Sequence, residues 1–279
     1  MKVFLLFLIA SVSILAQDFI PHLEQLQQNV INKMKANKVK RMEAISYQTD
    51  ANFYPLSEKY YYSYNYEYNE MGMITLVDYF NVEQDLRIET TYAYDQYGTI
   101  ESIVVTETSG GTQSSNPVVT NTTFWATVTD GTIERMTKYV SGELTNVYLF
   151  NYDGLGLATI LDSTVDLSSG VPNTLYTFNL EGNVVSKTSP NGNTFYTYDD
   201  KGNVIKEEME ISGSRYETTS DYDGDGNLVG VTVNGTAFTM NWIFQNDSAG
   251  LTLNGYSTYY TPGEGTSNYE WTTFIYTNY

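Results

Sequence analysis

The sequence predicts an all-β protein: an array of antiparallel β-hairpins that forms one extended or curled sheet, barrel-like if it closes, with a short N-terminal helix. Three observations predict this class. After Ser46 the chain is rich in Val, Ile, Thr and Tyr and keeps no helical period over a dozen residues. A Tyr-rich motif with a glycine in its turn recurs along the chain. The 279 residues include no cysteine, so the fold depends on its core rather than on disulfides.

The first element along the chain is a secretory signal peptide. Lys2 precedes an apolar run from Val3 to Ile14, and Ala16 is a small residue at a suitable cleavage position. The apolar run is too short to cross a bilayer as a helix, and no later segment is long and apolar enough. We therefore expect residues 1–16 to be removed. The mature protein is then exported, periplasmic, on the cell surface or extracellular, without a transmembrane segment.

Residues 17–46 are expected to form an amphipathic helix followed by a basic linker. The helix is predicted from Pro21 to about Lys38, because apolar side chains recur there at intervals of three and four residues. These apolar positions are Leu23, Leu26, Val30 and Met34. We expect this helix to cover one end or edge of the sheet that follows, or to dock a partner.

Residues 47–279 are predicted to form one domain of repeated hairpins, because the pattern aromatic-x-aromatic-Asp/Asn-x-x-Gly-x-apolar recurs. The paired aromatics share one strand face. The Asp or Asn binds nearby backbone in the turn, and the Gly takes the positive φ of a type I turn with a G1 bulge. The predicted turn pairs are Asn69 and Gly72, Asp95 and Gly98, Asp153 and Gly156, Asn179 and Gly182, Asp199 and Gly202, Asp223 and Gly226, and Asp247 and Gly250.

Three copies carry a resemblance to a known family: Tyr92, Tyr94, Asp95 and Gly98; Phe150, Tyr152, Asp153 and Gly156; and Tyr196, Tyr198, Asp199 and Gly202. They resemble the YD repeats, also called RHS repeats, of bacterial cell-surface and secreted proteins. The resemblance covers roughly residues 60–254. It implies a curved sheet displayed outside the cytoplasm. Family members often build large shells around cargo, and this chain is too short to close such a shell.

Charge and composition exclude several classes of function. The formal net charge is −19, which disfavours nucleic acid and anionic lipid and suits a cation, a neutral glycan or an envelope protein as partner. His22 is the only histidine and lies on the predicted helix, so a Ser-His-Asp triad within the sheet and a zinc site of several histidines are excluded.

A row of tyrosines is the first candidate ligand-binding site. Its members are Tyr60, Tyr62, Tyr64, Tyr66 and Tyr68. Residues two apart share a strand face, so the row could stack against sugar rings. The alternative is a ladder that packs against the next hairpin, and this interpretation is favoured because the repeats use the same positions for packing.

Asp221, Asp223 and Asp225 form a second candidate site, since they match the first half of a calcium loop. The twelfth position is Thr232 rather than a bidentate Glu, and the segment coincides with a predicted repeat turn. We therefore expect a turn, with calcium as the alternative and no other cofactor.

Paired carboxylates are the remaining route to catalysis. Glu208 and Glu210 share a strand face, and Asp199 and Asp200 lie in a turn, but no distinctive motif frames either pair. The sequence therefore favours a non-enzymatic binding or scaffold module of the bacterial envelope. A secreted carbohydrate-active enzyme and a structural protein that self-associates through sheet edges are the alternatives.

Two further features bear on where a ligand or a membrane would meet the chain. Thr106 to Thr123 and Asp162 to Thr174 are rich in small polar residues and are predicted to be long surface loops, where binding residues collect. An aromatic last residue, Tyr279, is typical of outer-membrane barrels, but polar and charged residues interrupt the required alternation along several strands. A membrane barrel is therefore not the favoured interpretation.

Overall fold

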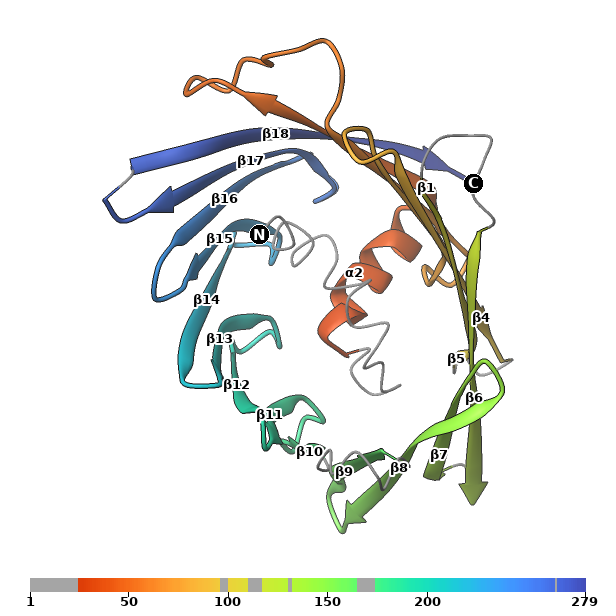
Figure 1. The fold of residues 1–279 in the computed structure, drawn as a ribbon. Coiled ribbons are helices and arrows are strands. Elements are labelled where there is room, and N and C mark those ends of the chain that lie inside the picture. Colours follow the sequence, from red (N-terminus) through yellow and green to blue (C-terminus); the bar gives the residue numbers. More distant parts are fainter. Residues whose placement is uncertain (1–24, 96–99, 110–116, 130–131, 165–173, 264) are drawn as a thin grey trace.

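The computed structural model describes residues 25–95, 100–109, 117–129, 132–164, 174–263 and 265–279, and in them the chain forms a closed antiparallel β-barrel of 18 strands. Each strand pairs with its neighbours in sequence, and the first strand pairs with the last, which closes the ring (Figure 1). The all-β prediction with one short helix is confirmed. The barrel form, left open by the sequence, is the one adopted.

The strands range from 5 residues in Thr174–Phe178 to 14 residues in Gly265–Asn278. The helix is α2 (Gln25–Ala36). The strands are β1 (Val39–Thr49), β2 (Tyr62–Tyr68), β3 (Ile74–Asn81), β4 (Leu86–Tyr94), β5 (Ile100–Ser109), β6 (Val118–Thr129), β7 (Thr132–Val140), β8 (Glu143–Asp153), β9 (Gly156–Thr164), β10 (Thr174–Phe178), β11 (Val184–Ser189), β12 (Gly192–Tyr198), β13 (Val204–Ile211), β14 (Ser214–Tyr222), β15 (Leu228–Asn234), β16 (Thr239–Asn246), β17 (Thr252–Thr261) and β18 (Gly265–Asn278).

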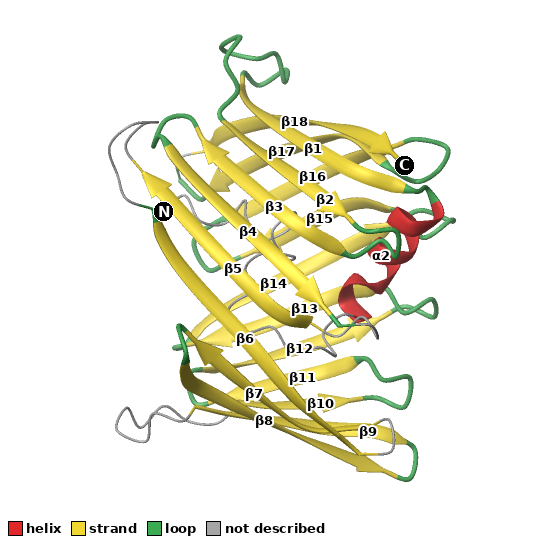
Figure 2. Ribbon diagram, turned by 90° about the vertical axis from the view of Figure 1, so that its right-hand side faces the viewer, coloured by secondary structure: helices red, strands yellow, loops and turns green. Residues whose placement is uncertain are grey.

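The up-and-down order places the connections at two ends of the barrel. The connections from even to odd strands, which carry the predicted turn pairs, share one end, here called the repeat-turn end. The connections from odd to even strands share the other, here called the loop end. Helix α2 and the C-terminus lie at the repeat-turn end (Figure 2). Closure leaves the described sheet without an edge strand, so self-association through sheet edges has no strand to use.

Helix α2 lies inside the ring at the repeat-turn end, which agrees with the expected cover over one end of the sheet (Figure 1). Met34 is buried, and Lys33 Nζ donates a hydrogen bond of 2.8 Å to Asn227 Oδ1. A Cβ atom at Gly72 would lie 2.4 Å from the carbonyl oxygen of Ile31, so only glycine permits this approach. None of the helices in the described part of the chain has the length and apolarity needed to span a lipid bilayer.

The structure corrects the expected basic linker, because most of its residues belong to the first strand. The helix ends at Ala36 and β1 begins at Val39, so residues 39–46 are already strand. Met42 and Ala44 are buried on its inner face, whereas Arg41 is exposed. The alternation of basic and apolar residues marked a strand with one buried face.

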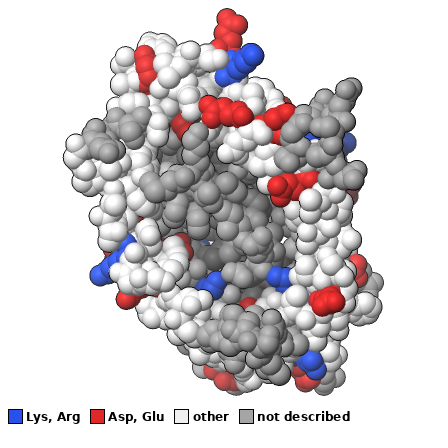
Figure 3. Space-filling view, viewed as in Figure 1, with Lys and Arg blue, Asp and Glu red and all other residues white. Residues whose placement is uncertain are grey.

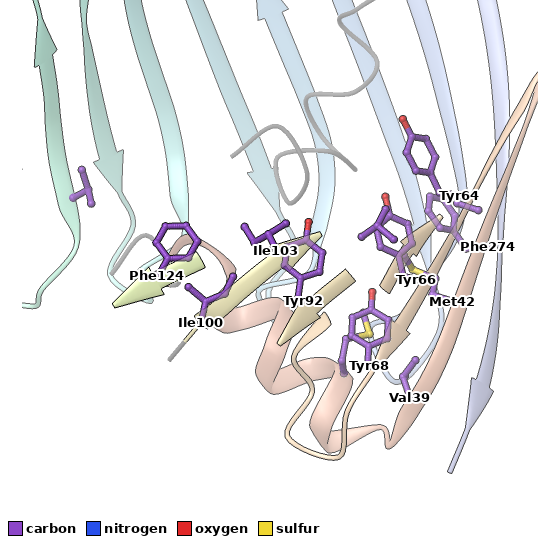
Figure 4. Close-up of a cluster of buried hydrophobic side chains, with 14 of the residues drawn as sticks. Val39, Met42, Tyr64, Tyr66, Tyr68, Tyr92, Ile100, Ile103, Phe124 and Phe274 are labelled. Atoms are coloured by element: carbon purple, nitrogen blue, oxygen red, sulfur yellow. The ribbon is translucent and has the colours of Figure 1, made fainter. Parts of the chain in front are cut away.

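The core is the inner face of the barrel, together with the buried side of helix α2 (Figure 4). Aromatic and aliphatic side chains from strands all round the ring contribute to it. The most deeply buried large residues are Tyr66, Ile100, Ile103, Met136, Tyr148, Ile160 and Tyr176. A second, smaller cluster centres on Val231 and Trp242. The aromatic pairs of the repeat thus face inward and form the core.

Five repeat turns share one geometry, in which the glycine has φ between 75° and 82°. In the turn at Asp199, the Gly202 amide donates to the Asp199 carbonyl oxygen and the Asp199 amide donates to the Asn203 carbonyl oxygen. The Asp199 carboxylate accepts from the amides of Lys201 and Asn203. The predicted type I turn with a bulge is therefore present. The five turn pairs are Asn69 and Gly72, Asn179 and Gly182, Asp199 and Gly202, Asp223 and Gly226, and Asp247 and Gly250.

Two predicted turns differ from this set. Asp153 pairs directly with Gly156, whose φ is 142°, so this turn is tighter and lacks the bulge glycine. The Asp153 carboxylate still accepts from the amides of Leu155 and Gly156. Asp95 ends its strand as expected, whereas Gly98 lies outside the described residues.

A recurring hydrogen bond joins many of the hairpins to the one before it; Phe178, which has no hydroxyl, cannot make it. The second aromatic of the motif donates its hydroxyl to the backbone oxygen that lies two residues after the preceding turn glycine. In the best-defined copies, Tyr198 donates to Val184 at 2.7 Å and Tyr94 donates to Ile74 at 2.8 Å. The same contact joins Tyr152 to Ile133, Tyr222 to Val204 and Tyr276 to Thr252, and Asn246 makes it through its amide to Leu228. The tyrosine beside Asp therefore links successive repeats.

The two predicted long loops are shorter than expected. Strand β5 continues to Ser109 and β6 begins at Val118. Both ends of the segment from Thr106 to Thr123 are therefore strand. Strand β9 likewise continues to Thr164. Thr and Ser are tolerated in a strand whose outer face meets water. A segment rich in small polar residues can therefore be either loop or strand, and composition alone did not distinguish the two.

Candidate ligand-binding surfaces

The tyrosine row faces the interior of the barrel, where it packs rather than meets a ligand from outside. Tyr64, Tyr66 and Tyr68 are buried (Figure 4). Tyr62 is also buried, and Tyr60 precedes the strand and is half-buried. The Tyr64 ring lies 4.8 Å from that of Tyr79 between centroids. Burial raises the pKa of the Tyr66 phenol well above its usual value. This burial agrees with the packing interpretation that the sequence favoured, and it leaves the row no outward face on which sugar rings could stack.

The three aspartates of the candidate calcium loop do not converge. The Asp223 carboxylate is bound within its turn, accepting from the amides of Asp225 and Asn227 and from the Asn227 side chain. These hydrogen bonds, with that from the Asn227 side chain the largest cause, lower the pKa of Asp223. Asp221 and Asp225 are exposed. Across the described ranges, no three His, Cys, Asp or Glu side chains come close enough to hold a metal ion.

Glu208 and Glu210 lie on the outer wall, where Glu208 belongs to an ion-pair network. Arg215 lies 2.5 Å and Lys206 3.3 Å from the Glu208 carboxylate. The hydrogen bond from Arg215, followed by that from Lys206, lowers the pKa of Glu208. A general acid needs a raised pKa so that it carries a proton at neutral pH. Glu208 therefore lacks the raised pKa of a general acid.

The turn acids form no catalytic pair either. The Asp199 carboxylate accepts hydrogen bonds within its own turn, where Asn203 donates from both its amide and its side chain. Asp200 is exposed in the same turn. Asp199 is thus a structural residue of the repeat.

Two buried acids were missed by sequence reasoning. Glu270 on β18 accepts a hydrogen bond of 3.2 Å from the Tyr62 hydroxyl, and burial raises its pKa to about 7. Glu207 on β13 faces the interior beside Tyr196, and burial raises its pKa, with Lys187 opposing the shift. Their position on the inner face follows from register, which the repeat turns fix.

The outer wall is hydrophilic over two regions of the ring. On β3 and β4, Arg87 contacts Asp78 at 2.7 Å and Glu89 at 3.6 Å. On β13 and β14, Lys206 contacts Glu217 at 3.0 Å within the network around Glu208. Acidic and basic groups lie at several places round the end of the barrel that Figure 3 shows. Charged side chains at mid-strand are costly on a surface that faces lipid.

The wall formed by β15 to β18 is different, because it carries no charge. These four strands contain a single charged residue, Glu270, which faces inward. Their outward positions hold hydroxyls, amides and aromatic rings, among them Thr232, Asn241 and Thr258, together with the exposed aliphatic side chains of Ile243 and Ile275. An uncharged wall on a chain of net charge −19 is a distinct surface.

Aromatic rings cluster on this wall where it meets β1. We call Tyr47, Phe53, Tyr256, Tyr269 and Trp271 the outer aromatic patch. Tyr47 and Trp271 stack with centroids 5.5 Å apart. Phe53, from the connection after β1, packs edge-on against Tyr256 at 5.1 Å and Tyr269 at 5.9 Å.

Polar groups border the outer aromatic patch. The indole Nε1 of Trp271 donates a hydrogen bond of 3.0 Å to Asn254 Oδ1, and Asn254 donates at 3.3 Å to Gln245. Tyr54 and Leu56, beside Phe53, are 69% and 68% exposed. The patch therefore combines ring surfaces, neutral amides and accessible apolar side chains on the outside of the barrel.

Sequence reasoning missed the outer aromatic patch because its members come from three separate strands and a connection. Tyr47, Trp271 and Tyr256 are brought together only by the pairing of β1 with β18 and of β18 with β17. One signal was present in the sequence: residues 228–246 and 265–278 contain one charged residue between them.

Comparison with known proteins gives only distant structural similarity. No protein-family model and no curated protein matches the chain. A porin-like protein from Bacteroides uniformis aligns with 86% of this chain and 97% of its own at 12% identity and a TM-score of 0.44. A porin-like protein from Bacteroides vulgatus aligns with 86% of this chain and 99% of its own, at 10% identity and a TM-score of 0.34.

A third solved structure, of TcdB2-TccC3, aligns with 84% of this chain at 11% identity and a TM-score of 0.30. The alignment covers 16% of that much longer chain. All three TM-scores lie below 0.5, so the function proposed below is argued from this chain's own residues.

Proposed function

We propose that the protein is an exported, non-enzymatic barrel of the bacterial envelope that acts as a binding module through its outer wall. The observation that carries this proposal is which side chains face into the barrel and which face out of it. The inner face holds a packed core around Tyr66 and Tyr148, and the outer wall holds ion pairs such as that of Arg87 with Asp78. Exposed apolar side chains such as Trp125 and Ile243 also lie on that wall, but ion pairs at mid-strand are costly on a surface that faces lipid.

The contacts between repeats support the proposal that the chain is built from YD-like repeats. The Asp fixes each turn, and the tyrosine before it binds the preceding hairpin, as Tyr198 does with Val184. Both recurring positions of the motif are thereby used for structure. Ligand contacts are left to residues outside the motif, such as those on the outer wall.

A non-enzymatic role is supported by the chemistry of the acids. Glu208 is held ionised by Arg215 and Lys206, and Asp199 and Asp223 are occupied in their turns. The two acids with raised pKa, Glu207 and Glu270, face the packed interior. Glu208, whose pKa is shifted in the opposite direction, follows Glu207 in sequence but lies on the other face of the sheet, so the two do not form a glycosidase pair.

One experiment tests both the export of the protein and the proposal that its outer wall faces water rather than lipid. The full chain is expressed in a Gram-negative host with its own N-terminus, and the fractions are extracted without and then with detergent. We expect a mature N-terminus at Gln17 and release without detergent. Retention of residues 1–16, with extraction only by detergent, would overturn the proposal.

Binding is tested with the mature protein, residues 17–279, and washed envelope fragments in a sedimentation assay. Saturable binding, with recovery of unaltered envelope polymer, is the expected result. Absence of saturable binding to any envelope fraction would count against a binding module, and release of soluble fragments would count in favour of an enzyme.

A further inference from the structure

The outer aromatic patch and the uncharged wall beside it have the features of a carbohydrate-binding surface. Sugar rings present apolar C–H faces that pack on aromatic rings, and their hydroxyls need neutral donors and acceptors nearby. Trp271, Tyr47 and Tyr256 offer the rings. Asn254 and Gln245 offer the amides at the same wall.

The phenol hydroxyls of the tyrosines in the outer aromatic patch can still donate and accept hydrogen bonds. The hydroxyls of Tyr47, Tyr256 and Tyr269 make no hydrogen bond to any described residue. Their rings are only partly buried, so the phenol oxygens can meet a ligand from solvent. The repeat tyrosines behave differently, because their hydroxyls bind backbone carbonyls, as Tyr276 does with Thr252 at 3.0 Å.

The charge of the wall and of the whole chain favours a neutral glycan over an anionic one. The outward positions of β15 to β18 carry no charged group in the described residues, and the chain as a whole is strongly acidic. An anionic polymer would be repelled by the protein's field and would find no cation at the wall. A neutral glycan meets neither obstacle.

We propose that the outer aromatic patch, with the uncharged wall of β15 to β18, binds a neutral glycan. Trp271 and Tyr256 stack against the sugar rings, and Asn254 and the tyrosine hydroxyls bind sugar hydroxyl groups. The exposed side chains of Tyr54 and Leu56 extend the surface towards the loop end. This inference rests on the proposed role as a binding module and names the class of ligand.

The test uses the mature protein, a panel of neutral and anionic oligosaccharides, and three variants. Trp271→Ala removes the central ring. Trp125→Ala is the matched control, because Trp125 is a 69% exposed tryptophan on the outer wall of β6, far round the ring. Tyr47→Phe combined with Tyr256→Phe removes two hydroxyls and keeps the rings, so it reports on binding even if Trp271→Ala fails to fold.

We expect neutral oligosaccharides to bind, with the dissociation constant raised about tenfold or more by Trp271→Ala, severalfold by the double Phe variant and not by Trp125→Ala. Equal loss in Trp271→Ala and Trp125→Ala, or binding of anionic glycans only, would overturn the assignment. If no oligosaccharide binds while envelope fragments still do, the glycan inference fails and the binding module stands. If neither binds, both fail.

Discussion

The hydroxyl of Tyr198 donates a 2.7 Å hydrogen bond to the backbone oxygen of Val184, and so joins one hairpin to the bulge of the hairpin before it. The bond lies beside the register shift between Thr177 and Phe178 in the pairing of β10 with β11. Because the same bond recurs around the ring, the aromatic-Asp dipeptide of the motif has two separate tasks. The Asp shapes its own turn, and the aromatic joins that turn to its neighbour.

Replacing Tyr198 by Phe is therefore expected to lower the free energy of unfolding by about 1 kcal/mol, since the ring stays and only the hydrogen bond is lost. Urea denaturation followed by far-UV circular dichroism measures this. Tyr54→Phe, at an exposed position where the hydroxyl makes no hydrogen bond to a described residue, is the control and should change stability little. Equal effects of the two variants would show that the contact between repeats does not stabilise the barrel.

The turn glycines provide a second test, because Gly250 and Gly202 differ in their surroundings. Both have a positive φ that strains any other residue, at a cost of about 1 kcal/mol. A Cβ at Gly250 would lie 2.1 Å from Asn227 Oδ1, whereas one at Gly202 would meet nothing within 4 Å. We expect Gly250→Ala to destabilise by about 1–2 kcal/mol more than Gly202→Ala.

Adding Asn227→Ala to Gly250→Ala checks the cause of that difference. If the Asn227 side chain is what the new methyl group meets, removing it should reduce the extra cost in a double-mutant cycle. An unchanged difference would point to strain elsewhere in the turn.

Substitutions at Asp223 and Asp225 distinguish a structural turn from a calcium-binding loop. The Asp223 carboxylate accepts three hydrogen bonds, whereas that of Asp225 accepts none in the described structure. Asp223→Ala should cost about 1–2 kcal/mol and Asp225→Ala less than about 0.5 kcal/mol. Thermal unfolding with and without calcium completes the test. A calcium-dependent rise in Tm that both variants abolish would establish a calcium loop instead.

Stability should fall as pH rises through the range set by Glu270. Burial raises its pKa from 4.5 to about 7, so the folded state favours the protonated acid. The stabilisation is fully present below pH 4.5 and is lost as pH rises to about 7, at a cost of about 3 kcal/mol. Glu207 acts in the same direction, because burial raises its pKa too. Unfolding curves at several pH values measure the slope.

Glu270→Gln should flatten that slope without removing it, since Glu207 remains. Glu210→Gln, at an exposed position on the outer wall, is the matched control and should leave the slope unchanged. A slope that is the same in all three proteins would mean that Glu270 is solvated in the folded state.

The repeat motif predicted local structure well and long-range structure only in part. Asn69, Asn179 and Asp247 sit in turns of the expected kind because the information for a turn is contained in four or five residues. The strand class followed from composition. Ring closure did not, because the pairing of Ala44 with Phe274 depends on the number of hairpins and their accumulated curvature.

The same limit explains the candidate sites. The tyrosine row was assigned correctly to one face of a strand, and only the closed barrel shows that this face is the interior. The outer aromatic patch could not be found in one segment, since register between β1, β18 and β17 assembles it. Short motifs are readable in the sequence, whereas sites assembled across strands require the topology.

The pairing of β1 with β18 has a consequence for how the barrel is made. Every other pairing joins neighbours in sequence, so it can form as the chain emerges, but this one must close a loop that contains nearly the whole domain. Such closure is entropically expensive and slow. Until β18 arrives, two strand edges stay open to other copies. The chain is therefore most at risk of aggregation just before completion, which favours passage across the membrane before folding and makes loss of the last strand more damaging than its length suggests.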